Sequence, residues 1–232
     1  MGVVISKWRR WCRPAVAVGC LLALSGCFDL TQKLSIGRGG GGRYETAIAA
    51  NGLLGEALKD NKSAIALKQN RATTRTVVRD GKVTQTAIID FKSVADLRLS
   101  DESVSLTNHG ASWLGLGPSH VTFRRTFLVD RARRQNAPRA AEGDKFGGEL
   151  AQTMFGDHVY AFSVSVPGSV ERANDLHVGR STIRPQIRSD GLSATTVTWR
   201  MPLYALLQAK LLTFEVDFSA YGLFPDAQSL PE

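Results

Sequence analysis

The sequence is poor in cysteine and has no long apolar run. Its three cysteines are Cys12, Cys20 and Cys27, and the first two lie in a basic N-terminal segment. Removal of that segment would leave one thiol, which excludes an internal disulfide, a zinc ribbon and a CxxC redox site. The apolar stretch Ala15–Leu24 has about ten residues, whereas a membrane-spanning helix needs roughly 20.

Acidic residues are absent from the segment 1–26, which carries four basic residues: Lys7, Arg9, Arg10 and Arg13. The whole chain has a formal net charge of +8. Without the segment the charge falls to about +4, which is too small to indicate a nucleic-acid-binding protein. The remaining chain of about 200 residues can bury one sizeable core or two small ones.

The first 26 residues have the organisation of a secretory signal peptide, with a basic region at 1–13 and the apolar stretch after it. Leu24-Ser25-Gly26-Cys27 follows at once and resembles the lipobox of bacterial lipoproteins. This resemblance implies cleavage before Cys27 by signal peptidase II, a thioether-linked diacylglycerol on Cys27, and acylation of the new amine by a chain such as palmitate. Two or three acyl chains anchor a protein stably where one does not. We therefore expect a signal peptide at 1–26 and an exported domain at 27–232.

Other interpretations of the N-terminus stay open: a cleaved but unlipidated secreted protein, an uncleaved anchor, and a twin-arginine signal at Arg9-Arg10. The residues after Arg10 lack the apolar pair of a twin-arginine signal. The lipoprotein interpretation places the chain in the bacterial cell envelope, anchored on the extracytoplasmic side of a membrane. Phe28 stands where an Asp commonly retains Gram-negative lipoproteins in the inner membrane. The outer membrane is therefore favoured if the source has two membranes.

Most of the exported sequence alternates with a period of two. The clearest segments are 28–36 and 43–51 around the Gly-rich connection 37–42, 74–79 and 82–91 around Asp80-Gly81, and 121–129, 160–166 and 212–220. Asp-Gly between two such segments predicts a hairpin with a type I′ turn. Helical spacing at 52–69, 149–155 and 202–208 predicts two or three short helices.

These patterns predict an α+β fold with a largely antiparallel β-sheet of about ten strands. The polar, Arg-rich segment 131–148 is expected to be a loop or a subdomain boundary. One domain with an insertion and two small subdomains are both compatible with this pattern.

Motifs for catalysis and for cofactor binding are absent from the sequence. There is no GxSxG elbow and no SxxK, and the glycines of 37–42 lead into a strand, whereas those of a phosphate loop lead into a helix. Glu215 and Asp217 alternate as on a solvated strand face. No metal-ligand spacing is found at any of the four histidines: His109, His120, His158 and His177. We expect no enzyme activity, no cofactor and no metal, although His109 and His120 flank a Gly-rich loop and could meet in space.

A cluster of arginines lies within a short stretch of sequence: Arg124, Arg125, Arg131, Arg133, Arg134 and Arg139. Two interpretations stay open. One is a solvated loop whose long side chains lie along the surface. The other is contact with anionic lipid headgroups or another envelope polymer, since a tethered basic patch gains about 1 kcal/mol per charge near such a surface.

A Pro-Gly turn at 166–170 precedes a late strand, Thr196-Val197-Thr198-Trp199, that contains a tryptophan. With the lipobox, these segments resemble small bacterial lipoproteins of the LppM-like type, over scattered parts of residues 27–220. The resemblance implies an α+β fold, an envelope location, and lipid or envelope association. It transfers no catalytic residues.

Two hypotheses about function follow. The first is a non-enzymatic lipoprotein whose exported domain binds a partner protein, a lipid or an envelope glycan. The alternative is a membrane-tethered hydrolase with a spatially assembled site. A histidine placed beside a serine or a carboxylate pair in a cleft would favour the hydrolase.

Overall fold

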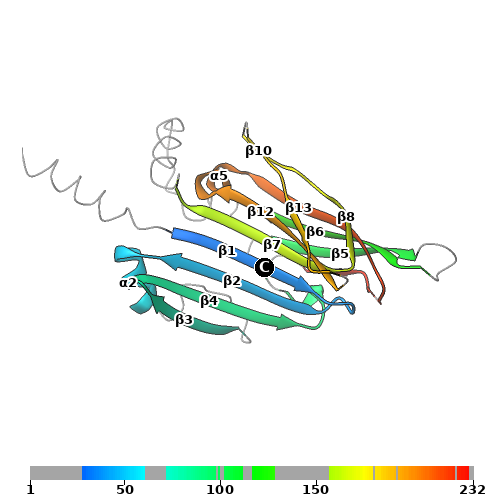
Figure 1. Cartoon of the computed structure of the whole chain (residues 1–232), viewed down its shortest axis with the longest axis horizontal. Helices are drawn as coiled ribbons and strands as arrows, with labels where there is room; N and C mark the ends of the chain where they lie inside the picture. The colour runs from blue at the N-terminus through cyan, green and yellow to red at the C-terminus, as the bar shows by residue number, and fades with distance from the viewer. Residues whose placement is uncertain are drawn as a thin grey trace, which may run out of the picture.

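The computed structural model describes residues 28–60, 72–97, 99, 102–111, 117–128, 157–179, 181–191, 193–222 and 224–229. The signal segment 1–26, Cys27 and the Arg-rich segment 131–148 lie outside these residues. Within the described parts, a seven-stranded and a five-stranded sheet pack face to face, with a two-stranded sheet beside them (Figure 1).

The seven-stranded sheet combines strands from the two ends of the chain. Its order is β11 (Gln186–Ser189), β12 (Ala194–Pro202), β7 (Val159–Pro167), β1 (Phe28–Ile36), β2 (Gly42–Ala50), β4 (Lys82–Phe91) and β3 (Thr73–Arg79). Neighbouring strands are antiparallel except β1 and β7, which run parallel in the middle of the sheet. This parallel pair joins the strands before residues 131–148 to those after them.

The five-stranded sheet has the order β14 (Ala227–Gln228), β5 (Glu102–Ala111), β6 (Ser119–Leu128), β13 (Leu211–Ala220) and β8 (Ser169–Ala173), and it is antiparallel throughout. The small sheet pairs β9 (Leu176–Val178) with β10 (Ser181–Ile183). The two short strands β10 and β11 follow each other closely in sequence but belong to different sheets. Pro185 lies between them and cannot donate a ladder hydrogen bond.

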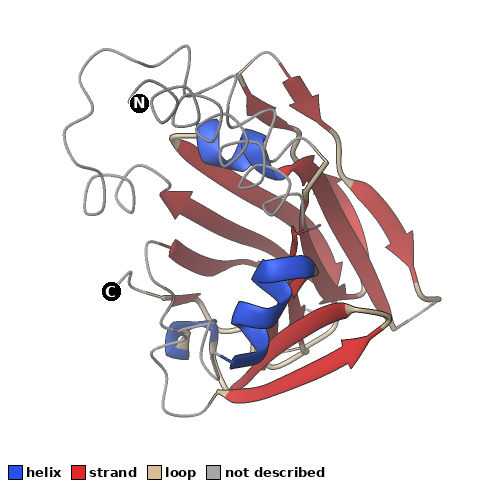
Figure 2. Ribbon diagram, turned by 90° about the vertical axis from the view of Figure 1, so that its left-hand side faces the viewer, coloured by secondary structure: helices blue, strands red, loops and turns tan. Residues whose placement is uncertain are grey.

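The α+β class predicted from the sequence is wrong, because the described residues are nearly all β. The two helices are α2 (Gly52–Asp60) and α5 (Leu203–Gln208), and a 3-10 turn, η1, covers Val94–Asp96 (Figure 2). Helices of nine and six residues are too short to form a layer over a seven-stranded sheet. The second layer is instead the five-stranded sheet, as in a β-sandwich. The predicted helix at 149–155 and residues 61–69 of the first predicted helix lie outside the described residues.

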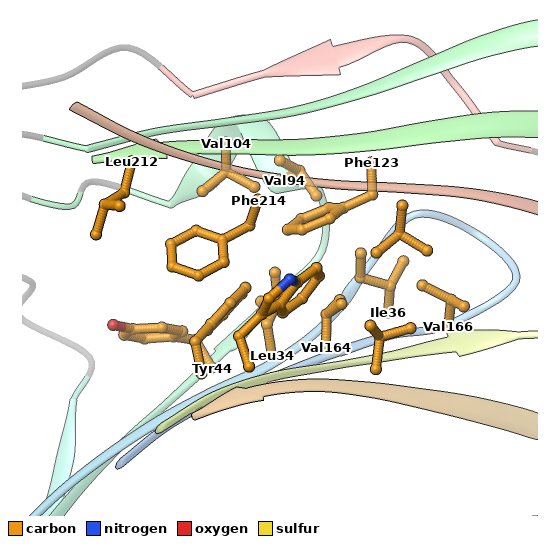
Figure 3. Packing of buried hydrophobic residues seen from close by; sticks show 14 of the residues in the cluster. Leu34, Ile36, Tyr44, Val94, Val104, Phe123, Val164, Val166, Leu212 and Phe214 are labelled. Atoms are coloured by element: carbon orange, nitrogen blue, oxygen red, sulfur yellow. The ribbon is translucent and has the colours of Figure 1, made fainter. Parts of the chain in front are cut away.

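The core lies between the two sheets, and the period-two alternation explains it. In β13, Phe214, Val216 and Phe218 are fully buried while the residues between them face outward. Phe214 meets Phe162 of β7 edge to face, with ring centroids 4.7 Å apart, and Phe162 stacks on Trp199 of β12 at 5.9 Å. Figure 3 shows this layer of side chains between the two sheets. The period-two alternation predicted for 160–166 and 212–220 is confirmed by the burial of β7 and β13.

Two hairpin turns follow the sequence prediction. Asp80 and Gly81 both have positive φ, 52° and 74°, as a type I′ turn requires between β3 and β4. The Gly-rich segment connects β1 to β2, as predicted. Its last residue, Gly42, is required sterically, because a Cβ there would lie 1.8 Å from the Ser35 carbonyl oxygen.

The first strand begins directly after the lipobox. Phe28 is the first residue of β1, and its backbone N–H donates to Nδ1 of His158 at 2.8 Å. The Leu203 N–H at the start of α5 donates to the His158 carbonyl at 2.7 Å. His158 therefore ties the start of β1 to the end of β12. In the described part of the chain, no helix is long and apolar enough to cross a membrane.

Candidate functional site: a polar groove on the five-stranded sheet

The outer face of the five-stranded sheet carries a groove of about 440 Å³. The groove crosses four strands, β5, β6, β13 and β8. It is lined by Ser105, Thr107, His109, His120, Val121, Thr122, Arg124, Glu171, Arg172, Glu215, Asp217 and Phe218. The polar members face outward because they alternate with core residues along each strand.

An ion-pair ladder crosses the middle of the groove. Arg124 on β6 holds one oxygen of Glu215 on β13, with Nη2 2.6 Å from Oε2. Arg172 on β8 holds the other oxygen, with Nη2 2.8 Å from Oε1, and its Nε lies 2.7 Å from Oδ2 of Asp217. Glu215 and Asp217 are therefore only 17% and 23% exposed, although the two arginines are largely exposed. The pairs fix the carboxylates in place and leave outer N–H groups of the guanidinium groups facing solvent.

Asp217 is also held by a hydrogen-bond chain from β5. The Thr122 hydroxyl donates to Asp217 Oδ1 at 2.8 Å, so Thr122 Oγ1 accepts from His109 Nε2, 2.9 Å away. Burial acts to raise the pKa of Asp217, but the hydrogen bonds from Thr122 and Arg172, with the charges of Arg172 and His109, lower it overall. Asp217 is thus a stable anion in the groove.

A serine, a histidine and a glutamate meet where β13 ends. Glu171 Oε1 lies 2.9 Å from His120 Nδ1, the Ser219 hydroxyl donates to the same carboxylate oxygen, and Ser219 Oγ lies 3.2 Å from the same Nδ1. Because Nδ1 faces a carboxylate, it carries a proton and donates. A general base needs an unprotonated ring nitrogen aimed at the serine, so this arrangement lacks the relay of a Ser-His-acid triad.

Arg124 and Arg125, two of the predicted surface arginines, lie on opposite faces of β6. Arg124 is in the groove and is paired with Glu215. Arg125 points into the core, where its side chain is 1% exposed and its Nη2 lies 2.6 Å from Glu102 Oε2. In this fold, Arg125 cannot reach a membrane surface. Four of the predicted arginines lie outside the described residues: Arg131, Arg133, Arg134 and Arg139.

The buried Arg125 organises a polar cluster between the sheets. Its Nη2 also donates to Gln32 Oε1 at 2.6 Å, and its guanidinium carbon lies 4.3 Å from the centroid of the Phe162 ring. The Tyr160 hydroxyl donates to the same Gln32 oxygen at 2.7 Å. Burial acts to lower the pKa of Arg125, but the charge and hydrogen bond of Glu102, together with Tyr160 and Tyr44, raise that pKa overall. Burial raises the pKa of Tyr160 to about 12.

The four histidines lie in three places. His109 and His120 both line the groove, as their positions around one loop suggested. His158 is buried beside Phe28, and His177 contacts Thr182. Among the described residues, no group of three His, Cys, Asp or Glu side chains could hold a metal. The lipobox residues Leu24, Ser25 and Gly26, with Cys27, lie outside the described residues.

Sequence reasoning missed Glu171 and Arg172 as groove residues and treated Glu215 and Asp217 as an ordinary solvated face. The alternation of β13 placed the two carboxylates on one face, but nothing in the sequence indicated that β8 would pair with β13. That pairing brings Arg172 and Glu171 beside them.

No family model matches this chain, and no curated protein matches it. Among solved structures, the chain is similar to the folded domain of LppM from Mycobacterium tuberculosis, determined by NMR. The identity is 12%, the TM-score is 0.43, and the match covers 83% of this chain and 90% of the LppM chain. The likeness is therefore distant.

Proposed function

We propose that this chain is a non-enzymatic lipoprotein of the bacterial cell envelope, anchored through Cys27, whose exported β-sandwich binds a neutral envelope glycan in the polar groove. The observation that carries the proposal is the ladder of fixed carboxylates and guanidinium groups across β6, β13 and β8. The lipobox and the lack of any linker before β1 support the anchor.

The charges of the groove favour a neutral ligand over an anionic one. Apart from the histidines His109 and His120, two cations, Arg124 and Arg172, stand against three carboxylates, Glu171, Glu215 and Asp217. Both arginines already pair with carboxylates, so neither is a free cation for a phosphate or an anionic lipid headgroup. The charges of the groove therefore argue against one of the three expected partners, a lipid, as the ligand of this surface.

The hydrogen-bonding groups of the groove suit hydroxyl groups. Carboxylates accept from a hydroxyl and guanidinium N–H groups donate to one, so a fixed pair of the two recognises neighbouring hydroxyls of a sugar. Ser105 and Thr107 add hydroxyls on the β5 side. A volume of about 440 Å³ lies within the usual range for small-ligand sites. A partner protein would instead be expected to use an apolar contact, and the outward side chains here are polar.

The alternative function, a tethered hydrolase, has one observation in its favour, the meeting of Ser219, His120 and Glu171. The geometry argues against it, because Ser219 and Glu171 approach one ring nitrogen of His120 and Ser219 donates directly to Glu171. The hydrolase therefore stays the second candidate.

The test is calorimetric titration of the full lipidated chain, in detergent micelles, with neutral oligosaccharides released from bacterial envelopes. We expect binding that weakens at least tenfold in Arg172→Gln, while Arg184→Gln binds as the wild type. Arg184 is the matched control, because it is an exposed arginine outside the groove, 3.9 Å from Asp175. Equal binding by wild type and Arg172→Gln, or no binding at all, would overturn the groove assignment. Oligosaccharide cleavage that is lost in Ser219→Ala would support the hydrolase instead.

A further inference from the structure

The anchoring cysteine is bonded to a residue whose position is fixed. The Phe28 backbone donates to His158, and the Phe28 ring packs edge-on against the His158 ring, with centroids 6.5 Å apart. Phe28, the residue that follows the proposed lipid-bearing cysteine in the sequence, is therefore part of the sheet. A lipid on Cys27 would therefore hold this end of the sandwich against the bilayer.

The strand register shows which elements share this end. Phe28 pairs with Ala50 at the end of β2, and Ala50 pairs with Val83 at the start of β4. On the other side of β1, β12 ends beside the start of β7, and α5 leads from there to Leu211, the first residue of β13. Figure 1 shows the start of β1, α2 and α5 at one end of the molecule. We call these strand ends, with α2, α5 and Leu211, the anchor end.

We propose that the anchor end rests on the headgroup layer of the bilayer that holds Cys27, and that the strands of the sandwich lead away from it. This inference rests on the lipid attachment of the proposed function. The bilayer is the occupant of this surface because no linker separates it from the lipid. The two surfaces described so far, the anchor end and the groove, would then have different partners.

The chemistry of the anchor end is compatible with headgroups. Three ion pairs lie there: Lys82 with Asp29 at 2.9 Å, Lys59 with Glu56 at 3.7 Å, and Arg79 with Asp80 at 3.5 Å. The exposed Lys210, directly before Leu211, adds a cation that anionic headgroups attract. Leu211 adds an apolar side chain that is 52% exposed, which loses unfavourable contact with water at an interface.

This orientation holds the groove away from the membrane. Glu215 lies four residues beyond Leu211 on β13 and Ser219 lies eight beyond it, which is about 14 to 27 Å along a strand. The groove would thus face the aqueous side, within reach of a polymer and out of reach of the acyl chains. Because no linker separates the sandwich from the lipid, the groove would stay at a nearly constant distance from the bilayer. It could then reach only ligands within that narrow layer.

The test measures the depth of two ends of one strand in the lipidated full chain. With Cys27 acylated, an introduced cysteine is the single reactive thiol, so Leu211→Cys and Tyr221→Cys can each be labelled with a fluorophore. Both positions are exposed; Leu211 is the first residue of β13, and Tyr221 follows its last residue. The proteins are reconstituted in phosphatidylethanolamine and phosphatidylglycerol vesicles that contain headgroup spin-labelled lipid. We expect the label at 211 to lose most of its fluorescence and the label at 221 to lose almost none.

The controls separate this inference from the anchor. Insertion of about ten Gly and Ser residues between Cys27 and Phe28 should reduce quenching at 211, because a flexible linker releases the sandwich from the surface. Mass spectrometry reads acylation of Cys27 in each sample. Acylated protein with equal quenching at 211 and 221, or with none at 211, would overturn the orientation and leave the lipoprotein proposal intact. Absence of acylation would overturn both.

Discussion

Arg125 and Glu102 form an ion pair inside the sandwich, with Nη2 2.6 Å from Oε2 and side chains that are 1% and 6% exposed. The pair joins neighbouring strands β6 and β5, and the guanidinium also reaches Gln32 of the opposite sheet. This charged cluster therefore links the two layers of the sandwich. Arg125 Nη1 has no hydrogen-bond partner among the described residues, so Glu102 and Gln32 compensate its charge only in part.

Glu102→Gln is expected to destabilise the fold by about 3–5 kcal/mol, because it leaves the buried Arg125 charge without its counter-ion. Urea unfolding checks this, with the fluorescence of the fully buried Trp199 as the probe. The double variant Arg125→Met with Glu102→Met should recover much of the loss, since an apolar pair needs no compensation.

The matched control is the ion pair of the adjacent residue on the outer face. Arg124→Met breaks an exposed pair with Glu215 and should cost less than about 1 kcal/mol. If Glu102→Gln costs no more than Arg124→Met, Arg125 does not carry its charge in a closed core.

The raised pKa of the buried Tyr160 hydroxyl leads us to expect that the fold loses stability at high pH. Burial raises its pKa to about 12 from the ordinary tyrosine value of 10.0. The unfolded chain loses this proton first, so the stability contributed by Tyr160 is fully present below pH 10.0 and falls as the pH rises towards 12. Tyr160→Phe removes that titration, together with the hydrogen bond to Gln32, which is worth about 1 kcal/mol.

The variant should therefore be less stable than the wild type at pH 8, and the difference should shrink as the pH rises above 10. Urea unfolding of both proteins between pH 8 and 11.5 measures it. A difference that stays constant over this range would mean that Tyr160 does not hold its proton in the core.

The sequence allowed prediction of strand faces better than of strand neighbours. Alternation placed Arg125 with Val121 and Phe123 on one side of β6 and Arg124 on the other, as the structure has them. The Asp80-Gly81 turn and the strand that starts at Phe28 were also predictable, because both depend on residues close together in sequence. The surface role suggested for Arg125 was inconsistent with its position on the apolar face of β6. Its buried partner Glu102 could not be predicted, because no nearby sequence pattern marks a carboxylate that pairs inside a core.

Long-range pairing accounts for what the sequence could not indicate. The parallel contact of β1 with β7 and the contact of β8 with β13 join residues far apart in the chain. The groove depends on the second of these, since Arg172 reaches Glu215 only through it. Fold class failed for a related reason: short helical patterns were counted as a layer, while the pairing of strands into a second sheet could not be read from any one segment.

The Gly-rich connection offers a steric prediction with an internal control. A Cβ on Gly42 would lie 1.8 Å from the Ser35 carbonyl oxygen, while one on Gly39 would have nothing within 4 Å. Gly42→Ala should therefore destabilise the fold by at least about 2 kcal/mol through a forced backbone shift. Gly39→Ala should be neutral or stabilising by a few tenths of a kcal/mol, because it restricts the unfolded chain. Equal melting temperatures for the two variants would contradict the register of β1 against β2.

The lowered pKa of Asp217 leads us to expect that the protein loses stability in acid. Burial favours its neutral form, but Thr122, Arg172 and His109 together lower its pKa. Its contribution to stability is therefore present above the pKa of an unfolded Asp and is lost as the pH falls through the lower pKa of the folded state. Asp217→Asn should flatten the fall in melting temperature between about pH 4 and pH 2. An unchanged slope would show that the ladder does not hold this carboxylate.

The anchor itself is tested by Cys27→Ala, which removes the sulfur that would carry the diacylglycerol. We expect the variant to leave the membrane fraction of the producing cell, since the proposed acyl chains on Cys27 are what would hold the protein on the bilayer. The fold should be unaffected, because β1 begins at Phe28 and its hydrogen bond to His158 uses the Phe28 backbone. Unchanged urea unfolding of the purified variant verifies this, and it distinguishes loss of the lipid from loss of structure. A variant that folds normally and still fractionates with membranes would show that something other than Cys27 holds the chain there.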